Sequence, residues 1–269
     1  MANSTNTVFK FCDAVSEVHQ LGRWGKRFGA FAGQAVGSVW FVFILCGMIV
    51  SAHAAQENAE ASKAQASRAY NPVYPYEALM AGHGGWAEIS VTVDNSGRAI
   101  LPSTVGASDA AFASALQADI EAIEYIPPRK NGQPLMSQLK VRFVFPEQPA
   151  LDVPARQILA ELRKPTPAFY TVDELDKKPE PIRQPQPAYP WILRSDGISG
   201  QAEIEFVVDR TGHPLFPHVI SASHADFGWA AATAVLRWRY QPPVKNGEKV
   251  DARIRETIVF DLNKASGMW

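Results

Sequence analysis

The segment Tyr240-Gln-Pro-Pro-Val-Lys-Asn-Gly247 reproduces, 115 residues later, the segment Tyr125-Ile-Pro-Pro-Arg-Lys-Asn-Gly132. The same offset carries Tyr74-Pro75 onto Tyr189-Pro190. No gap is needed across more than seventy residues, and roughly a third of the positions are identical. Because chance does not produce such an ungapped match, the chain contains two copies of one domain of about 75 residues.

Each copy predicts the same order of elements: short helix, strand, strand, helix, strand. The strands show the period-two alternation of apolar and polar residues that marks a half-buried strand. We therefore expect an α+β fold, with two copies of a small three-stranded antiparallel sheet packed with helices, and in addition an N-terminal apolar helix. The expected strands are 86–93, 99–107 and 135–145 in the first copy, and 202–208, 213–222 and 250–260 in the second.

Turn and helix signals recur at matching positions. Gly97 and Gly212 fit hairpin turns that need a positive φ. Ser108 and Ser223 stand where a helix N-cap belongs, each before about sixteen residues of helical character. The Pro-Pro pair that follows each helix is expected to end it, and Asn-Gly then supplies the next turn.

The N-terminal part predicts export. Arg23, Lys26 and Arg27 precede a long uncharged run, and Ala52-His53-Ala54 follows its most apolar part with the small-x-small pattern of a cleavage site. Positive charge before the apolar segment places the N-terminus inside and the rest outside. Whether the segment is a retained anchor or a cleaved signal peptide stays open. Both cysteines, Cys12 and Cys46, lie in this part.

The composition excludes some classes of protein and indicates a linker. With 26 Lys+Arg against 27 Asp+Glu, the net charge of −1 excludes a generally basic nucleic-acid binder. The expected parts are a leader at 1–35, a signal peptide or anchor at 36–54, a flexible linker at 55–70, a first domain at 71–146 and a second at 187–263. Between the domains, residues 147–186 are expected to form a helix and a Pro-rich linker. Residues 153–164 have helical spacing, and residues 164–187 are Pro-rich and predicted to be extended.

The second copy carries a specific combination of motifs. Tyr189-Pro190 is followed by Gly197 and Gly200, and later by Arg237-Trp-Arg-Tyr-x-Pro242. The combination resembles the C-terminal domain of the TonB family of energy transducers, closely over residues 184–262 and more loosely over 72–146. The membrane segment and the Pro-rich linker also fit that family's layout.

The resemblance implies a binding module that captures a short extended segment of an outer-membrane transporter on its last strand, residues 252–260. The partner would satisfy the unpaired N–H and C=O groups of that edge. Arg253 and Arg255 could alternatively only protect the edge from self-pairing, and Ala188 replaces the Gln that familiar members have before Tyr-Pro. The candidate partner-binding residues are Tyr189, Pro190, Arg194, Arg253, Arg255, Thr257 and Val259.

The resemblance further implies an inner-membrane location on the periplasmic side, with a possible ion-driven motor complex as a second partner. The alternative is a cleaved, soluble periplasmic scaffold without energy coupling. The resemblance implies that an anchor coupled to the ion-driven motor carries a polar His within the membrane helix. Here His53 lies at the end of the apolar run, which argues against energy coupling. Trp238 and Tyr240 are expected to be core residues.

We expect no enzymatic activity, cofactor or metal. The sequence has no Gly-x-Ser-x-Gly elbow and no phosphate loop. The histidines of the second copy, His213, His218 and His224, match no metal-ligand spacing.

Overall fold

The structure is a computed structural model that describes residues 63–265, all within the compact unit Ala55–Trp269. The predicted leader, the apolar segment 36–54 and most of the linker 55–70 lie outside the described residues. Within residues 63–265, no helix combines the length and the apolar character needed to cross a bilayer.

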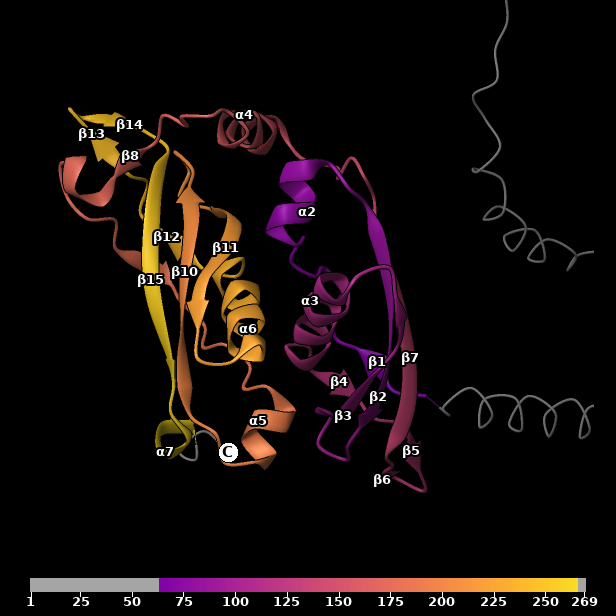
Figure 1. Ribbon diagram of the computed structural model, residues 1–269. Helices are drawn as coiled ribbons and strands as arrows, with labels where there is room; N and C mark the ends of the chain where they lie inside the picture. The colour runs from indigo at the N-terminus through magenta and orange to yellow at the C-terminus, as the bar shows by residue number, and fades with distance from the viewer. Residues whose placement is uncertain (1–62, 266–269) are drawn as a thin grey trace, which may run out of the picture. The chain divides into compact units, whose positions relative to one another are not determined.

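The first repeat forms a three-stranded antiparallel sheet (Figure 1). Strand β2 (Gly85–Val93) lies between β3 (Ala99–Ala107) and β7 (Ser137–Phe145). Helix α3 (Ala110–Glu121) packs on β2 and β3, and the short helix α2 (Tyr76–Ala81) precedes β2. The order of elements predicted for this copy is confirmed.

The second repeat has the same arrangement. Strand β10 (Gly200–Val208) lies between β11 (Pro214–Ala222) and β15 (Ala252–Phe260). Helix α6 (Ala225–Val235) packs on β10 and β11, and α5 (Trp191–Ser195) precedes β10. Helix α7 (Leu262–Ala265) follows β15.

One strand of the second sheet was not predicted. Strand β8 (Tyr170–Thr171) runs parallel to the start of β15, so the strand order is β11-β10-β15-β8. The expectation of three strands is therefore wrong for this copy. The chain segment that supplies β8 belongs to the Pro-rich linker, for which no strand was predicted.

The strand registers repeat with the sequence offset. Gly85 faces Phe145 across β2 and β7, and Gly200 faces Phe260 across β10 and β15. Each residue of the second pair stands 115 positions after its counterpart in the first. The two copies are thus the same structural unit, aligned as the sequence predicts.

The repeat also extends further upstream than predicted. Strand β1 (Gln65–Ala66) pairs with β4 (Tyr125–Ile126), and β9 (Pro181–Arg183) pairs with β12 (Arg239–Tyr240). Ala66 faces Tyr125 as Pro181 faces Tyr240. The predicted Asn-Gly turns are confirmed as tight hairpins, with positive φ at both turn residues. The hairpin strands are β5 (Arg129–Lys130), β6 (Gln133–Pro134), β13 (Val244–Lys245) and β14 (Glu248–Lys249).

Each repeat has its own core, built from the inward side of the sheet and the long helix. In the second repeat, Phe227 of α6 stacks on Phe260 of β15 with ring centroids 4.4 Å apart. The counterparts in the first repeat, Phe112 and Phe145, lie 4.8 Å apart. Burying one such ring contributes roughly 1.5–3 kcal/mol. The core positions Trp238 and Tyr240 are 5% and 1% exposed, as predicted.

A close backbone approach explains why glycine recurs at the first hairpin. Gly97 and Gly212 have φ of 83° and 89°, a region that favours glycine. Their carbonyl oxygens accept the N–H of Tyr125 and Tyr240 at 2.8 and 2.9 Å. A Cβ at Gly212 would lie 2.0 Å from the carbonyl oxygen of Tyr240. The hairpin can therefore meet the strand after the helix only where a side chain is absent.

The predicted helix starts are off by one residue. The N-caps are Asp109, whose carboxylate accepts the N–H of Ala111, and His224. Ser108 and Ser223 serve a different purpose, because each hydroxyl oxygen accepts a backbone N–H from the start of the central strand. The two serines thus connect sheet and helix rather than capping the helix.

The helices also end earlier than predicted. Helices α3 and α6 have 12 and 11 residues rather than about sixteen, and the Pro-Pro pairs do not end them. The chain becomes extended before the prolines because Tyr125 and Tyr240 donate their N–H groups to the hairpin glycines.

The segment between the repeats is partly helical and partly bound to the second repeat. Helix α4 (Val153–Leu162) confirms the predicted helix, with Asp152 accepting the N–H of Ala155. The Pro-rich part contains β8, the 3-10 turn η1 (Val172–Glu174) and β9. We call residues 169–183 the strap. The strap pairs with β15 and β12, so this part of the predicted Pro-rich linker is bound to the second repeat.

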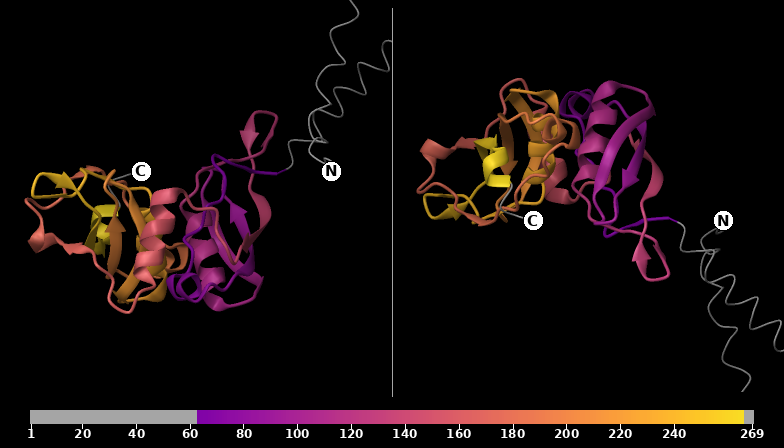
Figure 2. Two further views of the ribbon diagram at one scale, coloured as in Figure 1. Left: turned by 90° about the horizontal axis from the view of Figure 1, so that it is seen from above. Right: turned by 90° about the horizontal axis from the view of Figure 1, so that it is seen from below.

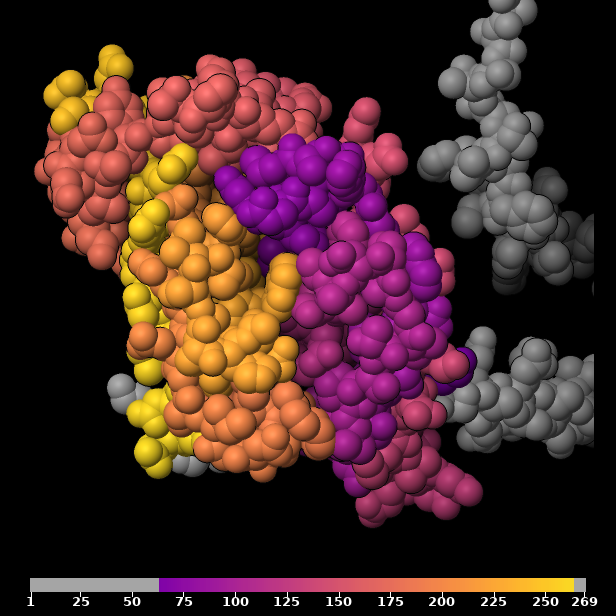
Figure 3. All heavy atoms as spheres, in the orientation of Figure 1, coloured from indigo at the N-terminus to yellow at the C-terminus, as the bar shows by residue number. Residues whose placement is uncertain are grey.

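The two repeats contact each other reciprocally. Helix α3 packs against α6, α2 contacts β11, and α5 contacts β3 (Figures 1 and 2). Val73, from the first copy, is part of the second core, and Trp229, from the second, packs on the first. In the space-filling view, atoms of the two copies meet along this boundary (Figure 3).

Candidate functional site

Strand β15 presents two different faces. Ala252, Ile254, Ile258 and Phe260 are buried toward the core. The residues between them lie on the other face, and four of these are the predicted partner-binding residues Arg253, Arg255, Thr257 and Val259. The structure therefore brings these four side chains together on one face of one strand.

The two arginines of this face are paired within the sheet. Arg255 Nε donates to Glu205 Oε2 at 2.7 Å, and Arg253 Nη1 lies 3.7 Å from Glu205 Oε1. The hydrogen bond and the charge of Glu205 raise the pKa of Arg255 above its ordinary value. Since Glu205 lies on the neighbouring strand β10, both arginines share one carboxylate before any partner arrives.

Within the described residues, a paired strand covers the outer edge of β15 only at its start. Ala252 and Arg253 face Tyr170 and Thr171 of β8. From Ile254 to Phe260, no strand within residues 63–265 pairs with the outer edge of β15. Near the far end, Val259 is 61% exposed. This part of the strand has the backbone groups and the access that an added strand requires.

Tyr189 and Pro190 have packing roles near the end of β15, where Phe260 lies. The Tyr189 ring meets Phe227 and Phe260 edge-on at 5.6 and 5.7 Å, and its hydroxyl donates to the carbonyl oxygen of Ile198. Pro190 is buried and begins α5. Contact of these two residues with a partner stays a prediction.

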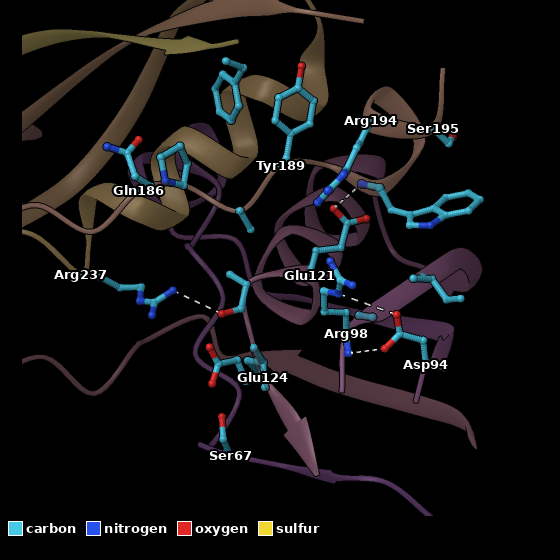
Figure 4. A pocket seen from close by; sticks show the side chains of 18 of the residues that line it. Ser67, Asp94, Arg98, Glu121, Glu124, Gln186, Tyr189, Arg194, Ser195 and Arg237 are labelled. Atoms are coloured by element: carbon cyan, nitrogen blue, oxygen red, sulfur yellow. Dashed lines mark hydrogen bonds and ion pairs between the residues drawn. The ribbon is translucent and has the colours of Figure 1, made fainter. Parts of the chain in front are cut away.

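Arg194 lies apart from the β15 face, in a cleft of about 1090 Å³ between the repeats (Figure 4). Arg98 and Arg237 also line it, and Arg237 donates to the carbonyl oxygen of Ala122. The cleft reaches Val259, so one wall is continuous with the exposed end of β15.

Glu121, at the end of α3, is the perturbed acid of this cleft. Burial raises its pKa to about 7, and the charge of Asp226 adds to the effect. Its carboxylate accepts from Gln117 and from the backbone N–H of Trp191 at 3.1 and 3.3 Å. These two hydrogen bonds act in the opposite direction and favour the charged form. Glu121 therefore connects the two repeats with a group that titrates near neutral pH.

The three histidines of the second copy have separate surroundings. His213 Nδ1 is 2.7 Å from the Thr211 hydroxyl, His218 stacks on Tyr76, and His224 caps α6. In the part of the chain that the structure describes, no three His, Cys, Asp or Glu residues are grouped so as to hold a metal ion.

Sequence reasoning missed two features of the site, the strap on β15 and the acid in the cleft. The strap leaves one sequence signal, since Phe169-Tyr-Thr-Val172 is a short aromatic and β-branched run inside a Pro-rich segment. Glu121 leaves none, because its buried setting depends on Trp191 from the other repeat.

Comparison with known proteins agrees with the geometry. The family model described as Gram-negative bacterial TonB protein C-terminal matches residues 70–146 and 185–262, together more than half of the chain. Protein TonB of Vibrio cholerae serotype O1 is 32% identical over 89 residues. That match covers 33% of this chain and 36% of the relative, so the chain spans about a third of the relative's length.

A solved structure, the solution NMR structure of the Pseudomonas aeruginosa TonB CTD, aligns at 23% identity with a TM-score of 0.29, covering 34% of this chain and 91% of that chain. The two matched segments contain the three long strands and the long helix of both copies, with their common register. The chain therefore belongs to the TonB family and carries its C-terminal domain twice.

Proposed function

We propose that the chain is a TonB-type energy transducer that binds outer-membrane transporters by adding a transporter segment as a strand to β15. The observation that carries the proposal is the outer edge of Ile254–Phe260, which no strand covers within residues 63–265. An extended segment laid along this edge would satisfy the backbone N–H and C=O groups that face outward.

The side chains flanking the edge would set preference, while the backbone provides affinity. Thr257 and Val259 offer a short polar and an apolar neighbour on the outer face, and Arg255 offers a charge already held by Glu205. Because Glu205 already pairs with both arginines, this face suits a partner recognised through its backbone more than through its net charge.

Backbone methylation of the partner tests strand addition directly. The probes are synthetic peptides copied from the periplasm-facing extended segments of outer-membrane transporters, carrying one N-methyl group at successive positions. In an added strand, alternate N–H groups point to β15. Methylation at those positions is expected to weaken binding about tenfold or more, because a hydrogen bond is lost and a methyl group intrudes. The intervening positions are the matched control, and equal effects at neighbouring positions would rule out strand addition.

The same proposal includes a single-pass anchor in the inner membrane, with both repeats on the periplasmic side and coupling to an ion-driven motor. Arg23, Lys26 and Arg27 before the apolar segment support this orientation. The second candidate function is a cleaved periplasmic scaffold that binds proteins without energy coupling, and Ala52-His53-Ala54 is the observation in its favour.

A further inference from the structure

The start of the docking edge is occupied by the chain's own strap. Tyr170 and Thr171 pair in parallel with Ala252 and Arg253, on the side of β15 opposite to β10. A partner strand that ran the whole length of β15 would need the two positions that β8 holds (Figure 1). The strap therefore lies where such a partner would lie.

The strap is tied down by several contacts. Thr171 and Glu174 form a capping box, in which the Glu174 carboxylate accepts the N–H of Thr171 at 2.7 Å and its hydroxyl at 2.9 Å. The Asp176 carboxylate accepts the backbone N–H groups of Asn246 and Gly247 at 2.9 and 3.0 Å. Lys245 also donates to the carbonyl oxygen of Glu174. The turn η1 and the β13–β14 hairpin are thereby joined beside β15.

Side chains on both faces of β15 complete the attachment. The Arg253 guanidinium lies 5.6 Å from the centre of the Phe169 ring, and Lys178 lies 3.7 Å from Glu256. Val172 packs against the second core. The strap thus contacts the outer face through an aromatic ring, the edge through backbone, and the inner side through an apolar side chain.

The contacts between the strap and β15 are weak enough for the strap to detach from the edge. The pairing with β15 is two residues long, and a two-stranded ladder of this length is weak by itself. The carboxylates that hold the strap are exposed, where ion pairs and hydrogen bonds contribute little each. A partner along Ile254–Phe260 has seven positions available and could displace β8 as it extends.

We propose that the strap is an internal competitor for the β15 edge, so that a long partner strand must displace Tyr170 and Thr171, whereas a short one binds beside them. The inference rests on the proposed strand addition and adds a regulatory step to it. It also assigns the chemistry of the partner: an extended segment with an aromatic and β-branched run followed by carboxylates, as in Phe169-Tyr-Thr-Val-Asp-Glu174.

Locking the strap is the first arm of the test. In the full chain with Cys12→Ser and Cys46→Ser, Thr171→Cys and Arg253→Cys place a cysteine pair at two residues that face each other across β8 and β15. The oxidised and reduced forms of this one variant are compared, so any effect of losing Arg253 cancels. The probes are transporter peptides of at least nine residues, long enough to span Ala252–Phe260, and a synthetic peptide of residues 167–176.

Releasing the strap is the second arm. Glu174→Ala with Asp176→Ala removes the capping box and the two acceptors for the hairpin N–H groups. Asp173→Ala is the matched control, since Asp173 is an exposed carboxylate of the same strap. The released variant is expected to bind the 167–176 peptide at least tenfold more tightly than the wild-type chain, and the control is expected to match the wild type.

The oxidised variant is expected to bind both peptides at least tenfold more weakly than the reduced form. Equal binding by the oxidised and reduced forms would overturn the competitor role. If the transporter peptides bind no variant while the 167–176 peptide binds the released one, the strap inference stands and the proposed partner is wrong. If the transporter peptides bind locked and released forms equally, the proposed function stands and the strap inference fails.

Discussion

Substituting Gly212 by alanine tests the close approach that defines each repeat. The new Cβ would lie 2.0 Å from the carbonyl oxygen of Tyr240, a contact that the backbone must open to relieve. The φ of 89° costs an alanine about 1–2 kcal/mol. Opening the contact also removes the hydrogen bond from the Tyr240 N–H to the Gly212 carbonyl, now 2.9 Å long, at about 1–2 kcal/mol because the donor lies next to a buried ring. We expect a loss of about 3 kcal/mol in the free energy of unfolding.

Gly247 provides the matched control. Its φ of 78° is similar, but a Cβ there would have nothing within 4 Å, so Gly247→Ala should cost only the backbone term of about 1–2 kcal/mol. Urea unfolding of the full chain gives both free energies, and hydrogen exchange of the Tyr240 amide reports the broken bond directly. A Gly212→Ala variant no less stable than Gly247→Ala would refute the reasoning. Gly97→Ala repeats the test in the first copy, where the contact is 2.1 Å.

Three further predictions concern the interface, the strap and the N-terminus. Burial raises the folded-state pKa of Glu121 to about 7, so its contribution to stability is full below the unfolded value near 4.5 and is lost as the pH rises through 7. Urea unfolding should therefore show that the wild type loses more stability than Glu121→Gln between pH 5 and pH 8. Equal losses in the two proteins would contradict this reasoning. Trp238→Phe replaces a buried indole by a smaller ring and removes the Nε1–H donor to the Pro185 carbonyl oxygen, now 2.9 Å away. The change should cost about 2–3 kcal/mol and speed proteolysis at residues 181–186, and unchanged proteolysis would show that this hydrogen bond does not hold that stretch. N-terminal sequencing of the mature protein should find the apolar segment 36–54 retained, and a chain beginning at Ala55 would exclude the anchored transducer.

Much of the fold was predictable because the two copies show the same sequence pattern at matching positions. Trp86–Val93 and Ala202–Val208 alternate in the same way, and a strand prediction made twice at one offset is stronger than either alone. The hairpin glycines and the Asn-Gly turns followed from backbone geometry, which depends on few residues. The edge strand β15 was predictable as the last strand of the copy that carries the family's motifs.

The missed features depend on contacts between distant segments. Strand β8 has two residues, too few to show the alternation of apolar and polar residues that marks a strand. The next residue, Val172, packs against the core of the second repeat and holds β8 beside β15. The N-caps moved because Ser108 and Ser223 bond to the central strands instead. The pairing of Arg253 and Arg255 with Glu205 needed the register of β10 against β15, which alternation by itself does not give.

The reciprocal packing of the two copies has a consequence for how the chain could change over time. In a twofold dimer of identical chains, every substitution at the interface occurs on both sides at once. Here Trp191 of α5 meets Glu121, while its counterpart Tyr76 of α2 stacks on His218. Joining the copies in one chain thus frees each half of the contact to specialise, so one boundary can hold a group that responds to acidity and the other can remain a passive aromatic stack.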